Sequence, residues 1–149
     1  MKKEEKLYNV LFPLWMLMLF PVFWLVILPG NFIIDSIVLV ISMYALHIAD
    51  KKKFYKSTIL KIFGIGLLSD VIGSAYMFIL AFCFELGTMG DELYLTVPAL
   101  VISAVCIYVL NYFISFAKCD KHTRKRLALT FAIATAPYTF LVPSSWLYY

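Results

Sequence analysis

The chain has 149 residues, of which 63% are hydrophobic and 15% are charged, and its mean hydropathy is +0.89. Soluble domains carry about 25% charged residues and cannot bury so much apolar surface, so the composition excludes a soluble globular protein and indicates a multi-pass membrane protein. The net charge of +4 does not indicate nucleic-acid binding, because the basic residues flank apolar segments, where membrane orientation and contact with anionic lipid explain them.

All thirteen Lys and Arg residues fall into three short clusters. The first, second and third basic clusters are, respectively, Lys2, Lys3 and Lys6; Lys51, Lys52, Lys53, Lys56 and Lys61; and Lys118, Lys121, Arg124, Lys125 and Arg126. Each apolar stretch between clusters is long enough to cross a bilayer twice, at ~20 residues per helix. All three clusters are therefore predicted to lie on one side of the membrane, and the positive-inside rule makes that side the cytoplasm.

The hydropathy pattern predicts an all-α bundle of five transmembrane helices in one domain, with the N-terminus cytoplasmic and the C-terminus outside. The predicted spans are residues 10–28, 32–49, 58–86, 93–117 and 127–142. A tight outer turn of Pro29, Gly30 and Asn31 separates the first two spans. The fifth span is the shortest, and a re-entrant hairpin in its place would return the C-terminus to the cytoplasm.

Prolines recur every eight residues along the first predicted span and at the start of the turn that follows it, at Pro13, Pro21 and Pro29. Each internal proline removes a backbone donor and leaves the carbonyl four residues earlier without its usual partner. A broken helix of this kind can present carbonyls to a cation or substrate, as in transporters. A kinked helix repaired by its neighbours is the favoured interpretation, because proline is common in membrane helices.

Two carboxyl groups, Asp35 and Asp70, fall inside predicted spans. A charged carboxylate at membrane depth costs at least ~2.5 kcal/mol, so such residues face a cavity, a partner or a function. Polar side chains share their helices at near four-residue spacing, which places them on related faces. The predicted ion- or substrate-binding residues are Asp35, Asp70, Asn31, Ser36, Ser69 and Ser74. Lys61 lies three residues into the third span, near its cytoplasmic end, and no other Lys or Arg lies within the spans. The acids therefore have no neighbouring cation and are expected to be protonated, solvated or bound.

Three hypotheses explain these acids: transport of a proton or cation, hydrogen-bonded contacts between helices, and a proteolytic aspartate pair. The third fails on motifs, because intramembrane aspartyl proteases carry GxGD and a Tyr-Asp pair, whereas Ser69 precedes Asp70 and Ile34 precedes Asp35. No enzyme motif is present, no metal or other cofactor is predicted, and no resemblance to a known family stands out.

The predicted function is movement of an ion, a proton or a small solute across the cell (cytoplasmic) membrane. A bundle of only five spans rarely encloses a transport pathway by itself. A homo-oligomer or a partner membrane subunit is therefore expected. The alternative is a membrane accessory, sensory or immunity protein that binds another polypeptide. Besides the lipid bilayer, the expected partners are therefore a small ion or solute and a membrane protein, with no nucleic acid.

Overall fold

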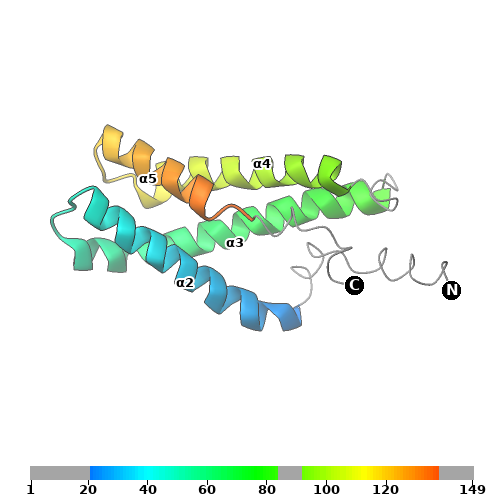
Figure 1. The fold of residues 1–149 in the computed structure, drawn as a ribbon, viewed down its shortest axis with the longest axis horizontal. Helices are drawn as coiled ribbons and strands as arrows, with labels where there is room; N and C mark the ends of the chain where they lie inside the picture. The colour runs from blue at the N-terminus through cyan, green and yellow to red at the C-terminus, as the bar shows by residue number, and fades with distance from the viewer. Residues whose placement is uncertain (1–20, 84–91, 138–149) are drawn as a thin grey trace.

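The computed structural model describes residues 21–83 and 92–137, and this part of the chain is helical with no strand (Figure 1). Its elements are α2 (Pro21–Ala45), α3 (Lys51–Cys83), α4 (Glu92–Leu110), the π-helix η2 (Asn111–Ser115) and α5 (Lys121–Ala134). The predicted all-α class is thus confirmed for the described residues.

Three of these helices are long and apolar enough to cross a membrane, over Pro21–Ala45, Lys51–Leu80 and Thr96–Ser115. Large apolar side chains remain exposed on them, such as Leu25 at 78% and Phe113 at 67%. Faces of this kind suit lipid rather than water. The sequence-based prediction of a membrane protein is therefore supported by the fold.

The predicted turn at Pro29, Gly30 and Asn31 is wrong, because α2 continues through all three residues. A turn within an apolar segment would leave several peptide groups without partners in lipid, whereas a proline inside a helix removes only one backbone donor. A single helix therefore replaces the boundary between predicted spans 10–28 and 32–49. Residues 10–20 of the first span lie outside the described residues.

Among the described residues, the fifth predicted span, 127–142, is helical only as far as Ala134, and a membrane crossing by this span stays a prediction. The helix α5 begins earlier, at Lys121, and ends at Ala134, and it is not among the helices long enough to cross a membrane. Pro137 offers no backbone donor and disfavours helical geometry at the preceding residue. The backbone N–H of Thr135 makes the last helical bond, to the Phe131 carbonyl at 2.9 Å. Residues 138–142 lie outside the described part of the chain.

The other two predicted spans need smaller corrections. The helix α3 begins at Lys51 rather than near Thr58, because the lysine-rich segment continues the helix instead of forming a loop. The fourth predicted span, 93–117, corresponds to α4 and η2 together, which run without interruption from Glu92 to Ser115.

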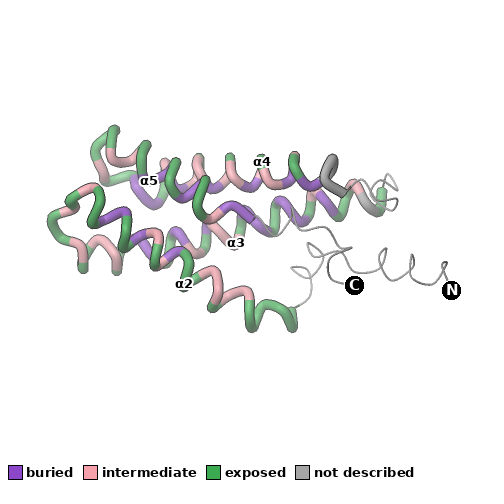
Figure 2. Tube along the Cα trace, in the orientation of Figure 1, coloured by how far each residue is buried: buried purple, intermediate pink, exposed green. Residues whose placement is uncertain are grey.

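The α2–α3 and α4–α5 connections lie at the same end of the molecule (Figure 1). This arrangement brings the start of the second basic cluster and the third cluster together, and we call it the basic end. The second and third clusters thus lie at one end of the bundle, which agrees with their predicted position on one side of the membrane, and that side stays a prediction. The first cluster lies outside the described residues. From the basic end, α2 runs away from α3 toward its own N-terminus, where residues 21–26 are all exposed (Figure 2).

A hydrophobic core lies near the basic end, where α2, α3, η2 and α5 meet. Phe116 is fully buried there, with its ring centroid 6.4 Å from that of Phe54 and 5.8 Å from that of Phe131. Leu39 and Ile62 join the same cluster from α2 and α3. The aromatic contacts therefore fasten the end of the α4–η2 helix to α3 and α5.

Arg124 differs from the other basic residues because it organises the α4–α5 connection. Its Nη2 donates to the carbonyl of Ala117 at 2.6 Å and to that of Cys119 at 3.4 Å. The guanidinium also lies over the ring of Tyr112, 5.1 Å from the centroid. Arg124 thus satisfies carbonyls that follow the helix end, a role for arginine in addition to membrane orientation.

Asp120 caps the N-terminus of α5, since its Oδ2 accepts a hydrogen bond from the Thr123 backbone N–H at 3.2 Å. The hydrogen bonds from Thr123 hold the pKa of Asp120 below its ordinary value. A lowered folded-state pKa means that the ionised carboxylate stabilises the fold above the unfolded-state pKa and loses this effect as the pH falls below it.

We therefore expect Asp120→Ala to lower the unfolding temperature at pH 7, with the difference from wild type narrowing as the pH falls from about 5 toward 3. Thermal unfolding in one detergent, followed by circular dichroism for both proteins at each pH, measures this difference. Effects of the other carboxylates are common to both proteins and cancel. A difference that stays constant down to pH 3 contradicts the role of the ionised cap.

Candidate functional site

Helices α2 and α3 bring Asn31, Asp35 and Asp70 together. The Nδ2 of Asn31 donates to Oδ2 of Asp70 at 3.3 Å. A Cβ built at Gly66 would lie 3.6 Å from Oδ2 of Asp35, so this carboxyl group rests on α3 one turn before Asp70. The two acids are close enough for their charges to interact. We call Asp35 and Asp70 the acid pair.

Both members of the acid pair are buried, with Asp35 4% and Asp70 6% exposed. The Oδ1 atom of Asp70 is fully buried and has no hydrogen-bond partner among the described residues. No Lys or Arg of the described chain contributes to the electrostatic surroundings of either acid. Two neighbouring carboxylates without a cation repel each other strongly in apolar surroundings, so the pair favours carrying fewer than two negative charges.

A small crevice of about 30 Å³ reaches Asp70 between α2 and α3. Its described lining residues are Trp24, Ile27, Leu28, Leu67, Asp70 and Val71. Asp70 is the only ionisable residue among them. A site of this size has room for about one or two water molecules, and Asp70 offers a polar partner.

The predicted site residues other than Asn31 and the acids lie elsewhere. Ser36 exchanges a hydrogen bond with the Tyr55 hydroxyl at 2.9 Å, nearer the basic end. The backbone carbonyl of Ser69 accepts a hydrogen bond from the Ser103 hydroxyl of α4, and the Ser69 hydroxyl is buried without a partner among the described residues. Ser74 is fully buried on α3, one helical turn beyond Asp70. The structure therefore groups Asn31 with the acids and shows separate helix contacts for Ser36 and Ser69.

A row of buried polar residues on α4 and η2 was not grouped by the sequence analysis. Its members are Thr96, Ser103, Asn111 and Ser115. The Ser115 hydroxyl donates to Asn111 Oδ1 at 2.7 Å, while Nδ2 of Asn111 is buried without a partner among the described residues. The spacing by multiples of four, or nearly so, was the available signal. This row packs α4 against α3, as small polar residues do between membrane helices.

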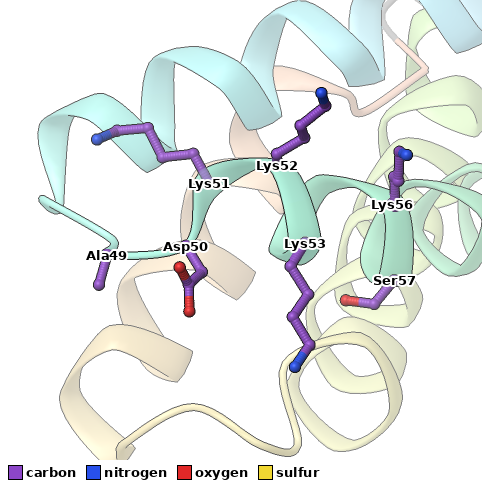
Figure 3. Close-up of a pocket in the computed structure, with 7 residues that line it drawn as sticks. All are labelled: Ala49, Asp50, Lys51, Lys52, Lys53, Lys56 and Ser57. Carbon is purple, nitrogen blue, oxygen red and sulfur yellow. The ribbon is translucent and has the colours of Figure 1, made fainter.

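An open hollow at the basic end is lined by the first two turns of α3 and the residues before them. Its lining residues are Ala49, Asp50, Lys51, Lys52, Lys53, Lys56 and Ser57 (Figure 3). The lysine side chains spread in different directions around the helix, and none of them converges with its neighbours on one point. Such a surface attracts anionic lipid headgroups at about 1 kcal/mol per lysine near the membrane.

The described residues contain no group of three or more His, Cys, Asp or Glu side chains that could hold a metal ion. The acid pair with Asn31 is therefore a site of two carboxyl groups and one amide. It can bind or release protons, and it provides few oxygen ligands for a metal cation. No family model matches the chain, and comparisons with curated proteins and with solved structures give no match either.

Proposed function

We propose that this protein moves an ion, a proton or a small solute across the cytoplasmic membrane, through the polar site that contains Asp35 and Asp70. The observation that carries the proposal is the convergence of two buried carboxyl groups from separate membrane helices. Burying both near one another is costly, and intramembrane acids of this kind commonly mark ion and proton pathways. Asn31 binds Asp70 directly, and Ser36, Ser69 and Ser74 act as further polar groups on the same two helices.

In this proposal the basic end faces the cytoplasm, in accordance with the positive-inside rule. The helices α2, α3 and α4 then make three crossings. Five crossings with a cytoplasmic N-terminus and an outer C-terminus stay a prediction. Because α2 is a single crossing, residues 7–20 would have to make the first crossing, and this segment is shorter than the usual minimum of ~17 residues for a membrane helix. We also propose that the chain works as a homo-oligomer or with a partner membrane subunit, since three long helices enclose little space.

Flux through purified protein in liposomes tests the transport proposal. Asp35→Asn removes an ionisable group and keeps the shape of the side chain. We therefore expect the flux of cations or protons across the liposome membrane to fall to the level of protein-free liposomes. Asp50→Asn is the matched control, because Asp50 is an exposed acid at the basic end. Undiminished flux in Asp35→Asn contradicts the site assignment.

The alternative function is that of an accessory, sensory or immunity protein that binds a partner. The open lysine-lined hollow at the basic end supports this alternative, since it offers positive charge to an acidic segment. In that case purified wild-type protein shows no flux, and cross-linking in cells recovers a different polypeptide on Lys52 or Lys53.

A further inference from the structure

We propose that the species moved at the acid pair is the proton, with Asp35 and Asp70 sharing one proton between them. This inference rests on the proposed function and names its substrate. It depends on the contacts of the acid pair, on the size of the crevice and on the charges around both.

The first argument is the charge balance of the site. From α2, the groups that face Asp70 are Asn31 and Asp35, and only Asp35 of these is ionisable. Between Thr96 and Ser115, the α4–η2 helix has no charged residue, and every charged residue of α5 lies between Lys121 and Arg126, at the basic end. No described cation faces the pair, so one proton on the two carboxyl groups removes the repulsion between them.

The second argument is the set of ligands. The Asn31 side chain gives its N–H to Asp70, so its nitrogen and not its oxygen faces this carboxyl group. Two carboxyl groups, with at most four oxygens between them, then remain as ligands, whereas Mg²⁺ takes about six and Ca²⁺ about six to eight oxygens. A proton needs only one oxygen to bind and a second to accept the hydrogen bond.

The third argument is the size and lining of the crevice. A cavity of about 30 Å³ between Trp24, Leu67 and Asp70 has room for one or two waters and excludes a hydrated metal ion or an organic solute. Apart from Asp70, the lining residues that belong to the described part of the chain are apolar or aromatic. Water that enters it meets a carboxyl group whose Oδ1 atom has no other partner among the described residues.

The proposed step is a proton transfer that breaks no other bond. Hydronium in the crevice gives a proton to the carboxylate of Asp70 and becomes water. The proton then passes from the Asp70 carboxylic acid to the Asp35 carboxylate, which becomes the acid as Asp70 returns to the carboxylate. Loss of the proton from Asp35 to water completes the transfer.

The test uses the full chain in liposomes, with an entrapped pH dye for protons and radioactive sodium and rubidium for metal cations. We expect proton flux at least tenfold above protein-free liposomes, and no sodium or rubidium uptake above that background. Asp70→Asn should lose the proton flux, while Asp50→Asn should keep it. Sodium or rubidium uptake that disappears in Asp70→Asn overturns the proton assignment and leaves the transport function standing.

Infrared spectroscopy of the same samples tests the shared proton without transport. At neutral pH, the wild-type spectrum minus that of the Asp35→Asn/Asp70→Asn variant should show one protonated and one ionised carboxyl group per chain. Two ionised groups overturn the inference. Absence of flux for all three ions contradicts the movement of protons or metal cations at the acid pair, and the infrared result then decides by itself whether the pair holds one proton.

Discussion

The double variant Asp35→Asn/Asp70→Asn is expected to pass protons no more slowly than either single variant, each of which loses roughly 10²-fold or more. If one proton passes from one carboxyl group to the other, removal of either group stops the transfer. Removal of the second group then causes no further loss of proton flux. Residues that act as one unit show this non-additivity, whereas independent sites give losses that multiply.

The measurement is the initial rate of proton flux at equal protein content, for wild type, both single variants and the double variant. Single variants that each lose part of the flux, with the double variant losing the product of the two factors, would indicate two independent pathways. Asp50→Asn added to the double variant controls for the change in total charge.

Phe116→Ala is expected to lower the free energy of unfolding by about 3–5 kcal/mol, the cost typical of removing a buried aromatic ring. Phe116 is fully buried between Phe54 and Phe131, so its ring joins three separate helical segments. The variant leaves a cavity at the point where the α4–η2 helix meets α3 and α5, and the rigid helices can close it only in part.

Phe113→Ala is the matched control, since Phe113 belongs to the π-helix that directly precedes Phe116 and is 67% exposed. Unfolding of both variants by denaturant in the same detergent gives the two differences from wild type. An equal and small effect at both positions would contradict the packing at the basic end.

The membrane character and the shared position of two basic clusters could be predicted from sequence because both depend on local composition. A run of apolar residues determines where a helix can cross, and lysine and arginine determine which connections stay in water. Neither property depends on how the helices pack. The second and third clusters therefore lie together in the structure as predicted.

The errors in the predicted helix boundaries came from residues whose conformational preference differs between water and lipid. Pro29 and Gly30 are typical of a turn in water, but α2 continues through both. In lipid, a continuous helix satisfies more backbone groups than a turn. Near the other end of the chain, α5 begins at Lys121, before its apolar part. The basic residues of its first turns led the sequence analysis to place the start of this segment at residue 127 instead.

The two members of the acid pair could be identified from the sequence, but their proximity in the structure could not be predicted. Asp35 and Asp70 lie on separate helices, and the rotation of α2 against α3 depends on contacts such as that of Phe32 with Phe63, whose ring centroids are 5.5 Å apart. Ser36 was assigned to the same site because it follows Asp35 in the sequence. Its hydroxyl instead forms a hydrogen bond with the Tyr55 hydroxyl.

The π-helix at Asn111–Ser115 has a consequence for the angular phase of the α4–η2 helix. An α-helix turns about 100° per residue, so a four-residue step overshoots a full circle by about 40°. Buried Ser103, Ile107, Asn111 and Ser115 repeat this step three times. The wider turn, closed by the bond from Phe116 N–H to the Asn111 carbonyl at 2.9 Å, holds more residues and so takes back part of the accumulated rotation. One continuous helix can thereby keep its polar row toward α3 and still direct Phe116 into the core beside α5.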